Sequence, residues 1–199
     1  MNKTKKSARA ELREISKYSD LQIKNFEKLK KRKNIPESEY LTKMKDDSNL
    51  IEFDNICTWF FTDAGTVRAV DGVSFDIPKG KTIGIVGESG CGKSVTSLSL
   101  MRLVHAPTGQ IVSGEIRYDN GKRAVDITKL PLKEMQKIRG NEIGMIFQEP
   151  MTSLNPVFTA GIQIDEAIKL HNPEMKKDDI KKRSVEMLDL VGIASPERI

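Results

Sequence analysis

The chain has 199 residues, a formal net charge of +5 and a hydrophobic content of 38%. This length suits one domain, or one domain with an appendage. No long apolar run is present, which predicts a soluble chain with neither a signal peptide nor a membrane span. Cys57 and Cys91 are too few for a disulfide framework and fit a reducing cytoplasm. His105 and His171 lack partners at metal-ligand spacing, so nothing supports a zinc site.

The positive charge is concentrated at the N-terminus. Residues 1–48 hold 14 Lys and Arg against 8 Asp and Glu, whereas residues 49–199 hold 19 against 20. This distribution argues against a nucleic-acid-binding core, and no nucleic-acid partner is expected. We interpret residues 1–48 as a basic N-terminal extension, helical or disordered. Its basic run at residues 28–33 could contact anionic lipid or nucleic acid, but a solvated, weakly helical extension is the favoured interpretation.

From residue 49 the pattern changes to strands separated by short turns. Apolar and aromatic runs predict strands at residues 50–53, 57–61, 67–70, 73–77, 82–86, 114–118 and 142–147. Helices are predicted at residues 95–104, 132–138, 160–170 and 177–191. The order predicts an α/β protein in which an antiparallel β layer leads into a core of buried strands. Residues 49–199 are expected to form this domain.

The most informative segment is residues 87–94, which read GESGCGKS and fit the phosphate-binding pattern G-x-x-x-x-G-K-[ST] at every fixed position. It lies between a predicted strand and a predicted helix, the order that this loop requires. Glycines let several backbone N–H groups point at one anion, and the helix that follows aims its positive dipole end at the same place. The alternative is a glycine-rich turn with a solvated lysine, and the flanking strand and helix argue against it.

Each position of this loop has an expected role toward a nucleoside triphosphate. Lys93 supplies a mobile positive charge for the β- and γ-phosphates, and the Ser94 hydroxyl can ligate Mg²⁺. The candidate nucleotide-binding residues of the loop are Gly87, Glu88, Ser89, Gly90, Cys91, Gly92, Lys93, Ser94 and Val95.

A second motif occupies residues 147–156, FQEPMTSLNP. It directly follows the predicted strand at 142–147, so its polar residues should emerge at the carboxyl end of that strand, where open α/β sheets place ligands. The neutral Gln148 can contact Mg²⁺ and orient water there. The alternative is a plain loop with a turn at Asn155-Pro156.

Together, residues 69–75, 84–94 and 147–156 strongly resemble the ATP-binding subunits of ABC transporters, in the branch of oligopeptide and dipeptide importers. The resemblance covers about residues 50–199. It implies Mg-ATP as the ligand and Gln148 as the residue that senses the γ-phosphate and Mg²⁺. It also implies an aromatic residue that stacks on adenine, for which Phe60 is chosen, with Phe61 as the alternative. The implied partners are transmembrane permease subunits, faced by the segment after Gln148, and a second ATP-binding subunit, at the cytoplasmic face of the membrane.

The resemblance also implies motifs that, in the apparent relatives, come shortly after the point that Ile199 corresponds to. The signature motif, the Walker B strand with its catalytic glutamate and the switch histidine do not occur in the 199 residues. We therefore expect a C-terminally truncated subunit, with no catalytic residue of its own and no ATP turnover when alone. The alternatives are a nucleotide-binding remnant or interaction module without transport activity, and an unrelated P-loop enzyme such as a small-molecule kinase. The Gln148 segment argues against that enzyme.

Overall fold

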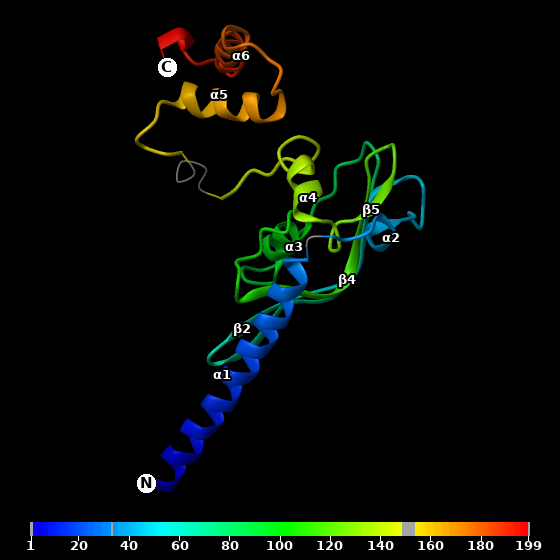
Figure 1. Ribbon diagram of the computed structural model, residues 1–199, viewed down its shortest axis with the longest axis vertical. Helices are drawn as coiled ribbons and strands as arrows, with labels where there is room; N and C mark the ends of the chain where they lie inside the picture. Colours follow the sequence, from blue (N-terminus) through cyan, green and yellow to red (C-terminus); the bar gives the residue numbers. More distant parts are fainter. Residues whose placement is uncertain (1, 33, 149–153, 199) are drawn as a thin grey trace. The chain divides into compact units, whose positions relative to one another are not determined.

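The computed structural model describes residues 2–32, 34–148 and 154–198, with side chains from Ala10 onward. The chain divides into two compact units, Met1–Ile143 and Gly144–Ile199. The first unit holds the sheet and the phosphate loop, and the second is helical (Figure 1). The mixed α/β class with an antiparallel layer is thereby confirmed.

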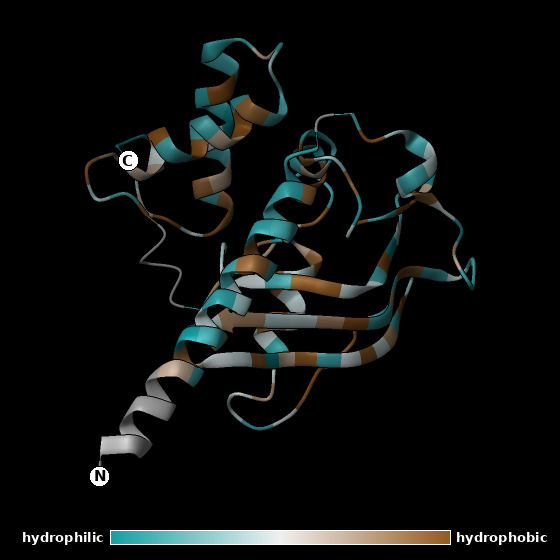
Figure 2. Ribbon diagram, turned by 60° about the horizontal axis from the view of Figure 1, so that its bottom comes forward, coloured by the Kyte–Doolittle hydropathy of each residue, from teal (hydrophilic) through white to brown (hydrophobic). Residues whose placement is uncertain are grey.

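The sheet of the first unit has five strands in the order β1-β5-β4-β2-β3, and every neighbouring pair is antiparallel. Hydrophilic and hydrophobic residues alternate along its long strands, as expected for a sheet whose two faces differ (Figure 2). The strands are β1 (Leu41–Thr42), β2 (Asn49–Thr62), β3 (Gly65–Pro78), β4 (Gly109–Asp119) and β5 (Ala124–Asp126).

Strands β2 and β3 form one long hairpin. Thr62 faces Gly65 at its tip and Asn49 faces Pro78 at its base. The sequence predicted four shorter strands in this region, because polar residues interrupt its apolar runs. The structure joins them through several irregularities in register, so the interrupting residues stay within the ladder.

The hydrophobic core lies between the sheet and the segment that follows β5. Ile56 and Ile116 come from the centre of the sheet, and Ile127, Leu130 and Met135 come from the covering segment. All five are at most 1% exposed. Helix α4 (Leu132–Ile138), which carries Met135, matches its predicted range.

The N-terminal segment is helical and packs against the sheet. Helix α1 (Asn2–Lys30) contacts β2 and β3, and the short helix α2 (Glu37–Tyr40) leads into β1, which pairs with β5. Residues 41–48 therefore belong to the same compact unit as the sheet, and Tyr40 is part of the hydrophobic core. The domain boundary after residue 48 stays a prediction.

Two predicted strands are not formed. Residues 82–86 and 144–147 have no regular secondary structure, and Ile143 makes only an isolated bridge with Arg139. Val86 is 92% exposed and Ile146 is 91% exposed. A buried parallel strand needs hydrogen-bonded neighbours and a covering layer on each face. Among the described residues, no strand pairs with these segments and no layer covers both of their faces. Their apolar sequence is therefore not sufficient to make them strands.

The second unit contains helices α5 (Ala160–His171) and α6 (Lys177–Leu190) and a final 3-10 turn at Pro196–Arg198. Thr159 caps α5 by accepting a hydrogen bond from the Ile162 amide, as expected for an N-cap threonine. The Ser184 hydroxyl donates to Asp165 and joins the two helices. Both helices fall where the apolar periodicity predicted them.

Candidate functional site: the phosphate loop

The phosphate loop leads directly into helix α3 (Lys93–Leu100). Gly90 and Gly92 have φ angles of 81° and 96°, in the left-handed region that side chains other than glycine rarely adopt. Gly92 is the N-cap residue, and no side chain caps the helix. The first backbone N–H groups of α3 are thus left for an external acceptor, which is the feature that binds phosphate at helix N-termini.

Gly92 is also required by the close approach of the loop to strand β3. A Cβ atom on Gly92 would lie 2.4 Å from the backbone oxygen of Ala69 and 3.5 Å from a methyl group of Val70. The loop therefore rests against the part of β3 that carries the resemblance to the transporter subunits. Only glycine satisfies both the backbone angle and this contact.

Lys93 lies with its charged end inside the loop. Its Nζ donates to the backbone oxygens of Gly87 and Glu88, both at 2.7 Å, and lies 3.5 Å from Cys91 Sγ. The ammonium group is therefore held by neutral carbonyl groups in the loop. A cation held in this way remains free to exchange these contacts for phosphate oxygens. Ser94, in the first turn of α3, is exposed.

The far end of α3 is fixed by two arginines that the sequence analysis did not single out. Arg139, at the end of α4, donates from Nε to the backbone oxygen of Met101 at 2.7 Å and from Nη2 to that of Arg102 at 2.9 Å. The Arg102 guanidinium donates to the backbone oxygen of Leu130. Burial, and next the positive charge of Arg139, lower the pKa of Arg102, while burial lowers the pKa of Arg139. No local signal marks either residue, because their partners are backbone carbonyls made available by the fold.

The middle of α3 is tied to strand β2 by a buried hydroxyl pair. Thr58 Oγ1 and Ser99 Oγ lie 2.8 Å apart, and Ser99 also donates to the backbone oxygen of Val95 at 2.7 Å. The helix that presents the phosphate loop is thus held at its N-terminus by glycine packing, at its middle by this pair and at its end by Arg139.

The two candidate adenine-stacking residues lie in different environments. Phe60 is half-buried near Gly109, whose Cβ would lie 2.8 Å from the Phe60 ring and 2.5 Å from Val104, just beyond α3. Phe61 is only 2% exposed and packs against Tyr18 and Phe26 of α1, with ring centroids at 6.4 and 6.0 Å. The ring of Phe61 is therefore already covered by protein.

Gln148 is exposed and belongs to the second compact unit, whereas the phosphate loop belongs to the first. The predicted approach of Gln148 to the loop stays a prediction. Residues 149–153, which carry most of the motif after it, lie outside the described residues. No cluster of three or more His, Cys, Asp or Glu side chains that suits a metal ion occurs in the part of the chain that the structure describes.

Comparison with protein families identifies the chain. The ABC transporter family model matches residues 70–196, which include the whole phosphate loop and Gln148. The chain belongs to the ABC transporter family. No helix among the described residues is long and apolar enough to cross a membrane.

Curated relatives support the same assignment. The chain is 49% identical over 152 residues to an oligopeptide transport ATP-binding protein of Bacillus subtilis (strain 168), AppD, covering 76% of this chain and 45% of AppD. It is 49% identical over 151 residues to OppD and 48% identical over 147 residues to DppD of the same organism, an oligopeptide and a dipeptide transport ATP-binding protein. These matches cover 76% and 74% of this chain, and 41% and 42% of those proteins. The predicted resemblance to the peptide-importer branch is confirmed, and the chain spans less than half the length of these relatives.

Solved structures agree on the fold. A dimeric post-hydrolysis structure of the ATP-binding cassette MJ0796, bound to ADP and Pi, is similar with a TM-score of 0.59 and 25% sequence identity. The similarity covers 70% of this chain and 56% of the cassette. A second dimeric structure of MJ0796, described as a bacterial ABC transporter cassette, gives a TM-score of 0.58 with the same identity and coverage.

Proposed function

We propose that this chain is the phosphate-binding part of an ATP-binding subunit that powers a peptide importer. The observation that carries the proposal is the loop at residues 87–94: left-handed glycines, an uncapped helix N-terminus and a lysine held by neutral carbonyls. This combination fits the triphosphate tail of ATP, because it offers backbone N–H groups and one mobile cation to a highly charged anion. Membership of the ABC transporter family supports the choice of ATP.

The loop residues have distinct roles in this proposal. Backbone amides of residues 87–95 surround the β- and γ-phosphates, and Lys93 exchanges its contacts with Gly87 and Glu88 for phosphate oxygens. Ser94 and Gln148 would hold Mg²⁺, because neutral oxygen ligands and phosphate suit this hard cation. The exposed Ser94 hydroxyl fits this role, and the bound Mg²⁺ would screen the charge of the phosphates.

Phe60 is the better candidate for stacking on adenine. Its ring is half-buried, whereas Phe61 is enclosed by α1. Phe60 also lies near Val104, just beyond the helix that presents the phosphate loop. Replacing Phe60 with Ala should therefore weaken nucleotide binding about 10-fold, the effect expected for the loss of one base–aromatic stacking contact.

The names of the relatives support peptides as the imported substrate, and the two dimeric structures of the cassette MJ0796 support pairing with a second ATP-binding subunit. Transmembrane permease subunits are the proposed docking partners, at the cytoplasmic face of the membrane. The segment after Gln148 suits such docking because it leaves apolar side chains exposed: Val157 is 81%, Phe158 53% and Ile162 52% exposed.

We further propose that these 199 residues bind nucleotide without turning it over. The sequence contains no candidate for the carboxylate that positions the attacking water. The lack of this carboxylate also favours the second candidate function, a nucleotide-binding remnant or interaction module without transport activity. Co-purification with two membrane subunits from the native host would support the importer subunit, and a chain recovered free of membrane proteins would support the remnant.

Isothermal titration calorimetry with Mg-ATP tests the central proposal. We expect binding to the purified chain that Lys93→Ala abolishes, because the loop then loses its only cation, and that Lys122→Ala, on an exposed turn, leaves unchanged. The absence of binding to folded chain would overturn the assignment of the loop. Steady phosphate release that Lys93→Ala abolishes would instead overturn the proposal that the chain does not hydrolyse ATP.

A further inference from the structure

Helix α1 is attached to the sheet along one side only. Ser19 Oγ donates to the backbone oxygen of Thr62 at 2.9 Å, and Ser16 Oγ donates to Asp63 Oδ1 at 2.9 Å. Phe26 stacks on Phe61 on the same side. These contacts fix the rotation of the helix about its axis, so the opposite side is held outward.

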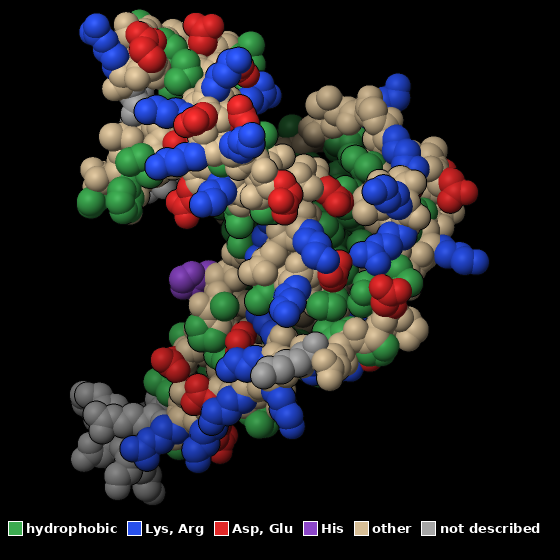
Figure 3. Space-filling model, turned by 45° about the horizontal axis from the view of Figure 1, so that its top comes forward, with side chains coloured by type: hydrophobic (Ala, Val, Ile, Leu, Met, Phe, Trp, Pro, Cys, Tyr) green, Lys and Arg blue, Asp and Glu red, His purple; other side chains and the backbone are tan. Residues whose placement is uncertain are grey.

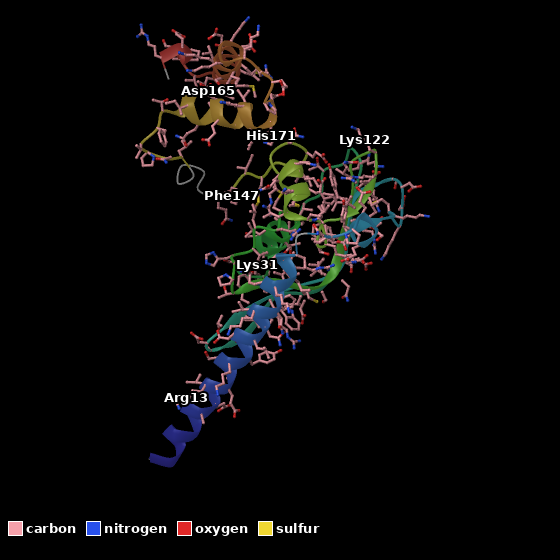
Figure 4. All side chains as sticks on the ribbon, viewed as in Figure 1. Arg13, Lys31, Lys122, Phe147, Asp165 and His171 are labelled. Carbon is pink, nitrogen blue, oxygen red and sulfur yellow. The ribbon has the colours of Figure 1, made fainter. Side chains whose placement is uncertain are left out.

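The outward side carries a row of cations, which we call the basic stripe: Arg13, Lys17, Lys24, Lys28 and Lys31. Successive members are three, four or seven residues apart, so at 3.6 residues per turn all five lie within an arc of about 60° and along about 27 Å of helix. All five are exposed. Lys31 follows the last residue of α1 but still makes a helical bond, from its amide to the Glu27 oxygen at 3.2 Å. In Figure 3, Lys and Arg side chains lie beside the N-terminal residues among Asp and Glu side chains, and Figure 4 labels the two ends of the stripe.

The cations of the stripe are not held in close ion pairs by neighbouring carboxylates, although the charge of Lys31 helps to lower the pKa of Glu27. Among the side chains that the structure describes, none of the five forms an ion pair within 4.0 Å. Glu14 and Asp20 border the stripe on its two sides, and Glu27 pairs with Lys30 instead, at 3.3 Å. Five like charges on a rigid element are mutually repulsive, and an external anionic surface would relieve this repulsion.

We propose that the basic stripe of α1 docks on anionic phospholipid headgroups. Four of its five cations are lysines, which bind phosphate as point charges and lack the planar fork that Arg uses to recognise bases. Leu21, at the edge of the stripe, is 55% exposed, as expected for an apolar side chain that reaches the boundary between headgroups and acyl chains. The side of α1 that carries Phe26 and Ser19 faces the sheet. Contact of the stripe with the membrane is therefore mainly electrostatic and reversible. This surface does not depend on nucleotide binding.

Co-sedimentation of the full chain with vesicles tests the proposal. We expect binding to vesicles of phosphatidylcholine and phosphatidylglycerol mixed at about 3:1, and little binding to phosphatidylcholine alone. The stripe variant Lys17→Gln/Lys24→Gln/Lys28→Gln should bind roughly 100-fold more weakly, since each lysine contributes a factor of about five. The control Lys177→Gln/Lys181→Gln/Lys182→Gln changes the net charge equally on exposed positions of α6 and should bind like the unmodified chain.

Three results would overturn the proposal. Equal losses of vesicle binding in the two triple variants would show that only the net charge matters. Equal binding to both vesicle types would show that exposed apolar residues drive the binding. Tighter binding to a DNA or RNA duplex than to vesicles, lost in the stripe variant, would assign the stripe to nucleic acid.

Circular dichroism checks that the variants remain helical. If the stripe variant unfolds, the unmodified chain decides the matter: vesicle binding that persists at about 0.5 M salt would contradict an electrostatic surface.

Discussion

Phe26 of helix α1 stacks on Phe61 of strand β2, with ring centroids 6.0 Å apart and ring planes 24° from parallel. This contact joins residues 35 positions apart and covers the tip of the β2–β3 hairpin beyond its last pairing with β4, at Phe60 and Gly109. The basic N-terminal segment is therefore a structural part of the sheet unit. Because α1 covers Phe61, the neighbouring Phe60 is the one that remains partly accessible.

Removing this stacking contact should destabilise the first unit. We expect Phe61→Ala to lower the free energy of unfolding by about 3–5 kcal/mol, as for other fully buried aromatic residues. Phe26→Ala, at a half-buried position, should cost less. A double-mutant cycle measured by urea denaturation should give a coupling of about 0.5–1.5 kcal/mol between the rings. No coupling would mean that α1 does not pack on the hairpin in solution. Leu21→Ala, on the exposed side of α1, is the control and should change stability by less than about 0.5 kcal/mol.

Glu52 should make the stability of the sheet unit depend on pH. Its fully buried carboxylate accepts hydrogen bonds from the Lys45 and Asp46 amides at 2.9–3.0 Å and from the Asn49 side chain at 3.1 Å. Burial alone would raise the pKa of Glu52, but these bonds and the charge of Arg117 together lower it below the ordinary 4.5. The folded protein therefore binds a proton at Glu52 less tightly than the unfolded chain does. The stability that the Glu52 carboxylate contributes is fully present above the ordinary pKa of 4.5, and it is lost as the pH falls through the lowered pKa of the folded protein.

Glu52→Gln tests this expectation. The neutral amide removes one of the two oxygens that accept the Lys45 amide, so we expect a loss of about 1–3 kcal/mol at neutral pH. The urea midpoint of this variant should also fall less steeply below about pH 5 than that of the unmodified chain. Glu37→Gln is the control, because Glu37 is exposed and its two side-chain contacts are long, 3.5 Å to Arg123 and 3.4 Å to the Tyr40 hydroxyl. An unchanged pH profile in Glu52→Gln would contradict the assigned role.

Two glycines of the phosphate loop should respond differently to substitution by alanine. Both have positive φ, so each substitution costs about 1–2 kcal/mol in backbone strain. A Cβ on Gly90 would meet nothing within 4 Å, whereas one on Gly92 would meet Ala69 oxygen at 2.4 Å. Gly92→Ala should therefore destabilise the protein further and displace the start of α3, with Gly90→Ala as its matched control. Equal thermal unfolding midpoints for the two variants would show that the loop does not rest on β3.

Arg139→Lys should loosen the end of α3 although the charge is kept. Lysine cannot reproduce the two bonds from Nε and Nη2 to the Met101 and Arg102 oxygens, and we expect a loss of about 1–3 kcal/mol. Hydrogen exchange of the α3 amides should be faster in this variant. Arg123→Lys, at a partly exposed ion pair with Glu134, should leave that exchange unchanged. Equal protection of α3 in both variants would remove Arg139 from the support of the phosphate loop.

The parts of this protein that could be predicted from sequence are those set by neighbouring residues. The phosphate loop at residues 87–94, the helix that follows it and helices α4, α5 and α6 all depend on backbone angles, glycine positions and periodicity over a few residues. The family resemblance has the same source, because its motifs are short and continuous.

Tertiary structure decided the rest, through contacts between residues far apart in the chain. It placed α1 on Phe61, added β1 to the sheet and used Arg139 to hold the end of α3, none of which has a local signal. It also left residues 82–86 and 144–147 outside the sheet, although their apolar sequences favour strands. A strand exists only where another strand accepts its hydrogen bonds and another layer covers its side chains, and one segment cannot specify either partner.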